Sequence, residues 1–358
     1  MEYRTIEEWC EILDSQRIPI TAKNRIEGPY PYYGANGIQG YVNDYIFDDE
    51  LVLLAEDGGN FGSKDRPIAY RVSGKCWVNN HAHVLKPKIG LDVDYLCYSL
   101  MFYNTNGLVN GATRQKLTQS TMRKMKIPYL EINKQREIVQ KIKKIESVLN
   151  DSNRQLDLLD ELVKARFVEM FGDVGIGLLK YQTCKLGDVA KVGSSHRVFT
   201  KEFVESGIPF YRGTEIGELA NGKKPINPYY ISEEHYKRLA DDETKPLIGD
   251  LLMPSICNKG QVWMVDSEEP FYYKDGRVLC ISPNKELFNS RFLQYFMREK
   301  TLVEYPKMGS GSTFAEFKIF LLKDMDVLVP PLELQNQFAS FVQEIDKSRS
   351  RIQKSLEA

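Results

Sequence analysis

Two segments of the chain carry apolar residues at the three- and four-residue spacing of a helix that buries one stripe. Gly and Pro are absent between Glu131 and Phe171, so nothing in the first segment interrupts helical hydrogen bonding. At about 1.5 Å per residue, roughly 35 to 40 helical residues would extend about 50 to 60 Å. A narrow stripe on so long a helix predicts pairing with a second helix. The stripe consists of Ile138, Ile142, Ile145, Leu149, Leu156, Leu159, Val163, Phe167 and Met170.

The second segment, residues 332–358, carries the expected partner stripe. Its apolar positions are Phe338, Phe341, Ile345, Ile352 and Leu356. We therefore predict that the two helices pack antiparallel. The second helix is shorter, so it can pair with only part of the first. Ser348 or Arg349 stands where an apolar residue is expected, which predicts a weak point or a contact made by another subunit.

The approach to each helix is duplicated at an offset of about two hundred residues. Residues 111–113 (Gly-Ala-Thr) correspond to residues 311–313 (Gly-Ser-Thr), and Met125 corresponds to Met325. Further upstream, residues 28–34 (Gly-Pro-Tyr-Pro-Tyr-Tyr-Gly) resemble residues 207–213 (Gly-Ile-Pro-Phe-Tyr-Arg-Gly). The helix entries match as well: Pro128, Leu130, Glu131 and Gln135 correspond to Pro330, Leu332, Glu333 and Gln337. The chain therefore contains a globular unit, a long helix, a second globular unit and a shorter helix.

Each globular unit is predicted to be α+β, with short strands separated by Gly and Pro turns. In the first unit we expect an amphipathic helix over residues 1–17, strands over 46–55, 68–72 and 77–85, and a helix over 92–102. In the second unit we expect strands over 247–254, 261–265 and 277–282. The predicted division is residues 1–128 and 173–330 for the globular units, with 129–172 and 331–358 for the helices.

The amino-acid composition restricts the class of protein to which the chain can belong. The chain has 358 residues, of which 42% are hydrophobic and 27% are charged, and this length suits two domains. Its six cysteines are scattered without a Cys-x-x-Cys pair, which argues against a zinc ribbon or a disulfide framework. Neither a signal peptide nor an apolar run of membrane-spanning length is present. We expect a cytoplasmic protein without a membrane partner, a metal or a cofactor.

Charge is distributed unevenly, although the formal net charge is only −1. Residues 111–148 contain ten bases and three acids. An acidic group without an interspersed base precedes them, and it consists of Asp44, Asp48, Asp49, Glu50, Glu56 and Asp57. This pattern predicts a positive surface for phosphate and an acidic surface that faces elsewhere, although solvated helix faces give similar clusters.

A few segments partly match catalytic or metal-binding motifs. Residues 227–230 (Asn-Pro-Tyr-Tyr) are one residue short of the loop of amino-group methyltransferases, and the glycine fingerprint for the methyl donor is absent. Residues 309–313 lack the Gly-Lys-Ser/Thr ending of a phosphate loop. His81 and His83 have no third ligand in view and are more typical of packing or hydrogen bonding than of a metal site. The sequence therefore predicts a non-catalytic protein.

The order of these motifs resembles the specificity subunit of type I restriction–modification systems over nearly the whole chain. The resemblance rests on residues 29–37, 208–213 and 111–117 and on the helix entries at 128–131 and 330–333. It implies two target recognition domains held apart by two antiparallel helices. Each domain would read one half of a bipartite site in double-stranded DNA. The helices would dock methyltransferase subunits, two in number, and restriction subunits would be further partners.

Half-sites on one face of DNA lie about 34 to 36 Å apart, a distance that a long helix can span. Base reading would use Arg or Lys on guanine and Asn or Gln on adenine, while basic and hydroxyl groups contact phosphates. The loop Thr113, Arg114, Gln115 and Lys116 suits both tasks, with Ser310, Ser312 and Thr313 as its uncharged counterpart. Further candidates are Tyr32, Tyr33, Asn36 and Lys64 in the first unit, and Tyr211, Arg212, Asn258, Lys259 and Arg277 in the second. For the tyrosines and Arg212, packing is an equally good interpretation.

Two other classes stay open from the sequence. One is a structural adaptor whose helices bind protein and whose globular units bind no DNA. The other is a methyltransferase that uses the loop at Asn227.

Overall fold

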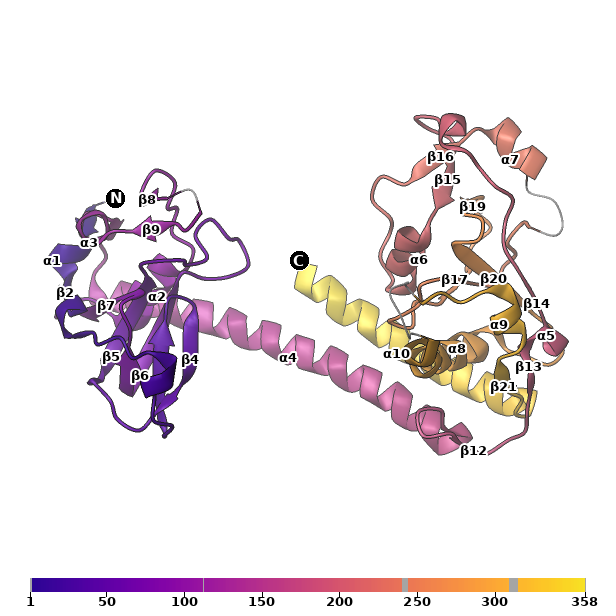
Figure 1. Cartoon of the computed structure of the whole chain (residues 1–358), viewed down its shortest axis with the longest axis horizontal. Helices are drawn as coiled ribbons and strands as arrows, with labels where there is room; N and C mark the ends of the chain where they lie inside the picture. The colour runs from indigo at the N-terminus through magenta and orange to yellow at the C-terminus, as the bar shows by residue number, and fades with distance from the viewer. Residues whose placement is uncertain (1, 112, 240–243, 309–314, 358) are drawn as a thin grey trace. The chain divides into compact units, whose positions relative to one another are not determined.

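The structure, a computed structural model, describes residues 2–111, 113–239, 244–308 and 315–357 (Figure 1). The chain divides into two compact units, Met1–Asp151 and Ser152–Ala358. Among the described helices, none combines the length and the apolar character that a membrane span requires. All six cysteines are free thiols.

Unit 1 is an α+β body built on one six-stranded sheet in the order β2-β7-β5-β6-β3-β4. The strands of this sheet are β2 (Cys10–Ile12), β3 (Tyr30–Gly34), β4 (Gly37–Val42), β5 (Phe47–Ala55), β6 (Ala69–Val78) and β7 (Ala82–Pro87). Smaller pairs join β1 (Tyr3–Thr5) to β10 (Lys126–Pro128) and β8 (Val109–Asn110) to β9 (Lys116–Leu117). The helices are α1 (Ile6–Trp9), α2 (Val93–Met101), α3 (Gln119–Arg123) and the first part of α4 (Ile132–Phe171), with 3-10 turns η1 (Asp14–Gln16) and η2 (Ala22–Asn24).

Strand β5 lies in the middle of the unit and is buried on both faces. Val52 and Leu54 belong to the apolar cluster under α1 and α2, whereas Leu51 and Leu53 belong to the cluster on the opposite face. All four side chains are fully buried. Because successive side chains of a strand point to opposite faces, this single strand links the two cores and fixes the register of its neighbours.

Two expectations for unit 1 are wrong in detail. Residues 1–17 do not form one helix: Thr5 caps the four-residue α1, and the flanking segments are strands that pair with β10 and β7. Inter-strand hydrogen bonding outweighs the helical spacing of the apolar residues there. The strand expected over 77–85 is interrupted, because the side chain of Asn79 accepts a hydrogen bond from the amide of His81 at 2.8 Å and turns the chain.

Unit 2 contains a four-stranded sheet, β14-β20-β17-β18, and a three-stranded sheet, β16-β15-β19. Their strands are β14 (Ala190–Gly193), β15 (Ile208–Tyr211), β16 (Tyr229–Ile231), β17 (Leu251–Pro254), β18 (Trp263–Met264), β19 (Tyr272–Tyr273) and β20 (Val278–Pro283). Two further pairs are β11 (Gly172–Asp173) with β12 (Leu178–Leu179) and β13 (Thr183–Lys185) with β21 (Asp326–Leu328). The helices are α5 (Leu186–Val189), α6 (Gly213–Ala220), α7 (Glu233–Leu239), α8 (Ser290–Glu304), α9 (Ile319–Lys323) and α10 (Leu332–Glu357), with 3-10 turns η3 (Thr200–Glu202) and η4 (Tyr305–Met308). The strands expected over 247–254 and 261–265 are shorter than predicted.

Strand pairing repeats between the units. Val52 pairs with Leu85 in unit 1 as Leu251 pairs with Ile281 in unit 2. The parallel pair of Tyr33 with Val78 likewise corresponds to that of Tyr211 with Tyr273. Unit 1 keeps one continuous sheet because the ten-residue β6 reaches both β5 and β3. In unit 2 the corresponding strand is broken into β18 and β19 around a segment containing Pro270, which has no amide hydrogen to donate.

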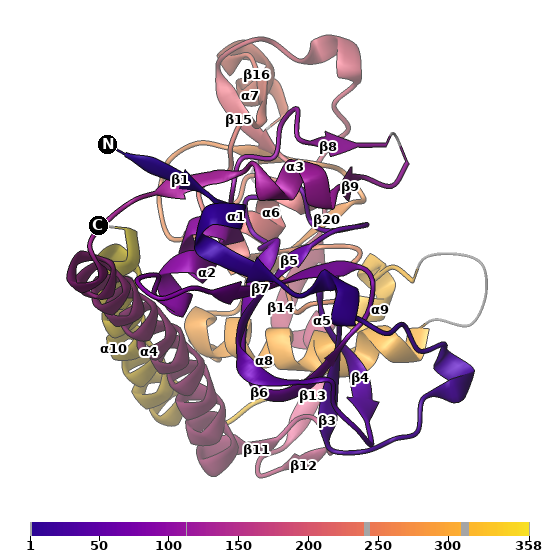
Figure 2. The same ribbon diagram turned by 90° about the vertical axis from the view of Figure 1, so that its left-hand side faces the viewer.

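Within unit 2, the C-terminal part of α4 packs against α10. The rings of Phe167 and Phe171 lie 5.4 Å and 5.7 Å from that of Phe338, near the start of α10. Asp160, earlier in α4, pairs with Arg349, later in α10. The two segments therefore run antiparallel, and both views show them side by side (Figures 1 and 2). Arg349, the polar interruption of the stripe, is thus matched by an acid on the facing helix.

Candidate nucleic-acid interface

In unit 1, the loop over residues 113–117 is joined by hydrogen bonds to the turn that follows β5. The amide of Leu117 donates to the carbonyl of Glu56 at 2.7 Å, and the amide of Gly58 donates to the carbonyl of Gln115 at 2.9 Å. The side chain of Asn36, from the β3–β4 turn, donates to the Gly58 carbonyl at 3.0 Å. Three segments that are far apart in the sequence therefore meet here. They bring together four of the predicted residues, namely Asn36, Arg114, Gln115 and Lys116.

The basic side chains of this loop are paired with acids of the same unit. Nε of Arg114 lies 2.7 Å from Oδ1 of Asp57, and Nζ of Lys116 lies 3.1 Å from Oε1 of Glu56. The expectation that the acidic group faces elsewhere is therefore wrong for these two acids. Two more of its members pair with bases of neighbouring strands: Asp49 with Lys86, and Glu50 with Arg71. Strand pairing brings these opposite charges together, although the sequence separates them.

A buried charged network holds the base of this loop. His83 is fully buried, with Nδ1 2.7 Å from Oδ2 of Asp14 and Nε2 2.9 Å from the Leu117 carbonyl. Asp14 also accepts from the amide of Val84 and from Gln119, both at 2.9 Å. Burial raises the pKa of Asp14, but the hydrogen bond and charge of His83, together with the hydrogen bonds from Val84 and Gln119, outweigh burial and lower it. Both ring nitrogens of His83 thus face oxygen atoms, and the ring connects Asp14 to the backbone of the loop.

Asp14, Glu56 and His83 are close enough to one another to share a metal ion. Cations of the protein already occupy that place, however. Nη1 of Arg17 lies 2.6 Å from Oε2 of Glu56 and donates to the Ala82 carbonyl at 2.7 Å, and Lys116 binds the other carboxylate oxygen. The group is therefore an ion network that fixes the loop, and its geometry does not favour a metal site.

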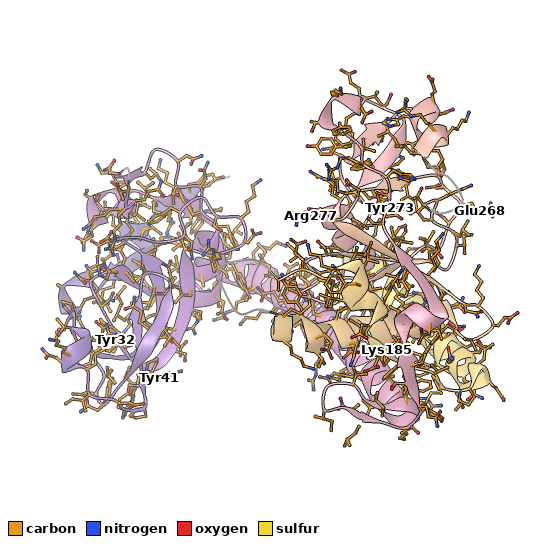
Figure 3. All side chains as sticks on the ribbon, turned by 45° about the vertical axis from the view of Figure 1, so that its right-hand side comes forward. Tyr32, Tyr41, Lys185, Glu268, Tyr273 and Arg277 are labelled. Carbon is orange, nitrogen blue, oxygen red and sulfur yellow. The ribbon has the colours of Figure 1, made fainter. Side chains whose placement is uncertain are left out.

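The remaining candidates of unit 1, Tyr32, Tyr33 and Lys64, are not part of the loop over residues 113–117 or the turn that supports it. Tyr32 is 1% exposed, and its hydroxyl bonds to the backbone of Ile20, so it is a packing residue and its assignment to DNA is wrong (Figure 3). Tyr33 is half-buried and stacks on Tyr70 with ring centroids 5.8 Å apart, and burial raises the pKa of its hydroxyl. Lys64 is exposed on the segment between β5 and β6.

In unit 2, Arg277 lies directly before β20 and corresponds by strand register to His81, while its partner Glu316 occupies the loop position of Lys116. Its Nη1 lies 3.1 Å from Oε1 of Glu316, and its side chain is 58% exposed. The backbone connections repeat those of unit 1: the amide of Phe317 donates to Ser255, as that of Leu117 donates to Glu56. Figure 3 shows Arg277 at the surface of unit 2, whereas Tyr273 lies in its interior. The strand register aligns His83 with Leu279, so the base of this loop is apolar in unit 2.

The other candidates of unit 2 fall into two groups, those that pack within the unit and those that are exposed. Arg212 binds Glu215 at 2.5 Å at the start of α6 and lies over the ring of Tyr229, which indicates a structural role. Tyr211 stacks on Phe271 in the apolar cluster of this unit, and burial raises the pKa of its hydroxyl. Asn258 and Lys259 are exposed in the loop after β17. Ser310, Ser312 and Thr313 lie outside the described residues.

Several residues of the site were missed by sequence reasoning. Asp57 and Glu316 are the acids that pair with Arg114 and Arg277, and Gly58 hydrogen-bonds to the loop in unit 1. The duplication could not reveal these pairs, because aligning the two units places Arg277 at the position of His81 and Glu316 at that of Lys116. For His83 the sequence favoured packing or hydrogen bonding over a metal site, and its bonds to Asp14 and the Leu117 carbonyl agree with that prediction.

The segment at Asn227 does not have the setting that methyl transfer requires. Asn227 adopts a left-handed conformation with φ of +56° and leads into β16, which pairs antiparallel with β15. In methyltransferases, by contrast, the corresponding loop follows a strand of a parallel sheet.

A family model identifies the class of protein to which this chain belongs. The family model described as "Type I restriction modification DNA specificity domain" matches residues 1–159 and 179–358, one copy for each unit. The chain belongs to the type I restriction–modification specificity family. It is a non-catalytic specificity subunit, and its role is DNA target recognition. Specificity subunits of these systems act with DNA and with methyltransferase and restriction subunits.

Similar proteins support this assignment. A putative type I specificity subunit from Haemophilus influenzae is 28% identical and covers 99% of this chain and 90% of its own length. The MjaIX specificity subunit from Methanocaldococcus jannaschii is 23% identical over 77% of this chain and 68% of its own length. An S subunit structure from M. genitalium has a TM-score of 0.60 at 15% identity, covering 99% of this chain and 92% of that chain. A chain from a structure of a type I complex gives a TM-score of 0.52 at 16% identity, with 99% and 92% covered. At these identities the structures support the fold alone.

Proposed function

We propose that this specificity subunit reads a bipartite, asymmetric DNA site, with one half-site for each globular unit. The proposal rests on a backbone connection that is repeated in both units and has an exposed arginine beside it in each. Arg114 and Arg277 come from different segments of the repeat, but each is exposed, is paired with an acid and lies beside the same backbone connection between the end of β5 or β17 and the loop. Repeated presentation of an exposed arginine suits the reading of two separate base sequences.

In this proposal, residues 1–128 and 173–330 are the two recognition domains, related by a pseudo-twofold axis. The helices over 129–172 and 331–358 set the distance between half-sites. α4 has 40 residues, which corresponds to about 60 Å of helix and exceeds the separation of about 34 to 36 Å between half-sites one DNA turn apart.

The helices would also dock two methyltransferase subunits. Several large apolar side chains of α4 are exposed, which supports contact with another protein. These residues are Ile145, Val148, Leu149, Leu158 and Leu162.

The test is methylome sequencing of a host that expresses this chain with its methyltransferase subunit. We expect adenine methylation at one bipartite asymmetric sequence, and neither methylation nor cleavage by the purified chain alone. If the assembled complex shows no sequence-specific DNA binding, the two units do not read DNA and the structural adaptor becomes the better interpretation. Methyl transfer by the chain alone would also contradict the proposal.

A further inference from the structure

Arg114 is held by the turn after β5 and does not extend freely into solvent. Its Nε lies 2.7 Å from Oδ1 of Asp57, yet its side chain remains 58% exposed while that of Asp57 is 22% exposed. Gly58 lies against the guanidinium, and a Cβ at that position would come within 3.0 Å of Nε. Gly58 also adopts a φ of +69°, which disfavours other residues. The close approach and the ion pair together fix the direction of the arginine.

This pairing leaves the outer part of the guanidinium available. Nε is used by Asp57, and Nη2 lies 3.4 Å from Nδ1 of His81. The terminal nitrogens still carry hydrogens that can reach two acceptors side by side. Guanine offers such a pair in the major groove, N7 and O6, and arginine recognises it through its planar fork.

A phosphate is a poorer partner for Arg114 at this place. The Asp57 carboxylate lies directly beside the guanidinium and would repel a phosphate bound there. The neighbouring acid, Glu56, is already balanced by Arg17 and Lys116, so Asp57 is the acid that acts on Arg114. Base recognition is therefore favoured over phosphate binding.

The backbone that carries Arg114 is fixed by hydrogen bonds, so the orientation of the side chain is maintained. Gln115 and Leu117 are bonded through their backbones to Gly58 and Glu56, and the Leu117 carbonyl accepts from the buried His83. The loop is thus fixed on both sides of Lys116.

We propose that Asp57 is a positioning residue that holds Arg114 for binding guanine in the half-site read by unit 1. The inference rests on the proposed function, since it requires that unit 1 reads DNA. Arg277 belongs to unit 2, where its partner Glu316 also binds Lys318 at 3.1 Å. Arg277 therefore serves as a control for the other half-site.

The experiment measures binding of the complex with its methyltransferase subunit to a DNA library in which each half-site is randomised separately. Arg114→Ala should abolish a guanine preference at one position of one half-site. Asp57→Ala should reduce the same preference about tenfold, which corresponds to the lower part of the range for one bidentate contact. Asp57→Asn keeps an oxygen that can accept from Nε and should have an intermediate effect. Arg277→Ala should leave this position unchanged.

A second readout separates positioning from simple damage to the fold. Asp57→Ala should leave affinity for non-specific DNA unchanged or raise it, because a negative charge near the phosphates has been removed. Asp65→Ala removes the same charge from the same connecting segment and should leave base preference intact. Asp57→Asn carries the test if the alanine variant unfolds unit 1.

The proposal is overturned if the Arg114-dependent position does not prefer guanine. It is also overturned if the Asp57 variants leave the preference intact, or weaken all sequences equally. Failure of the proposed function gives a different result, because the wild-type complex would then select no bipartite sequence.

Discussion

Gln135 and Gln335, one near the start of each long helix, make the same set of hydrogen bonds in the two units. Oε1 of Gln135 accepts from the amide of Asp92, and its Nε2 donates to the carbonyls of Gly90 and Leu130. Oε1 of Gln335 accepts from the amide of Asn289, and its Nε2 donates to the carbonyls of Leu287 and Pro330. Both side chains are fully buried. Each glutamine thus ties its helix to the start of α2 or α8.

Replacing Gln135 with alanine should destabilise unit 1 by about 3 kcal/mol, because it leaves buried donor and acceptor groups unpaired at a cost of about 1–3 kcal/mol for each group. The measurement is denaturant unfolding, with hydrogen exchange at the Asp92 amide as a local probe. Gln140→Ala, at an exposed position of the same helix, is the matched control and should change little. Equal stability of the two variants would show that water replaces the lost bonds.

Introducing a charge between α4 and α10 should separate these helices. Ile345 is buried in the apolar cluster that also contains Val163 and Phe167. Ile345→Asp should destabilise unit 2 by a few kcal/mol, on the order of 3 to 4, because an unpaired carboxylate would be buried. Leu159→Asp should act in the same direction. Gln343→Asp places the same charge on an exposed position of α10 and controls for helix propensity. Thermal unfolding of the three variants decides the matter.

Acid should destabilise unit 1 through its buried network. Burial raises the pKa values of Asp14 and Glu56, but hydrogen bonds and charge from His83, Arg17 and Lys116 outweigh it, so both pKa values are lowered. A carboxyl group with a lowered folded pKa stabilises the protein above its unfolded pKa, about 4, and loses that contribution as the pH falls further. Asp14→Asn should therefore flatten the loss of stability below about pH 4.

Unit 2 contains a buried acid, Asp250, whose pKa is shifted in the opposite direction. Burial raises the pKa of Asp250, so its contribution is present at low pH and is lost as the pH rises through the folded pKa. Hydrogen exchange followed separately in peptides of the two units, from about pH 3 to pH 7, checks both directions. An acid response of unit 1 that survives in Asp14→Asn would exclude Asp14 as its source.

Damage to one recognition loop should be confined to one half-site. Replacing Arg114 and Gln115 together removes one possible guanine contact and one possible adenine contact, each worth about 1–3 kcal/mol of discrimination. We expect specificity to relax only in the half read by residues 1–110 and this loop. Arg277→Ala should relax only the other half. Methylation of libraries randomised in each half measures this, and equal relaxation of both halves would mean that the units do not read independently.

The sequence alone determined the elements whose signal is local and repeated. α4 and α10 begin at Ile132 and Leu332, within three residues of the predicted boundaries at 129 and 331, because long apolar periodicity without Gly or Pro specifies a helix whatever surrounds it. The duplicated segments were equally visible, since they depend only on comparing the chain with itself. The match to Gln135 was shifted, however: the sequence comparison paired it with Gln337, whereas the hydrogen bonds pair it with Gln335.

Tertiary structure decided everything that depends on which distant residues meet. Strand pairing turned the expected helix over residues 1–17 into α1 between two strands, and it placed Tyr32 in the interior. It also brought Asp57 to Arg114 and Asp14 to His83, pairs separated by more than fifty residues. The charge pattern along the chain could not reveal these pairs, because an ion pair depends on distance in space, and the sheet sets that distance.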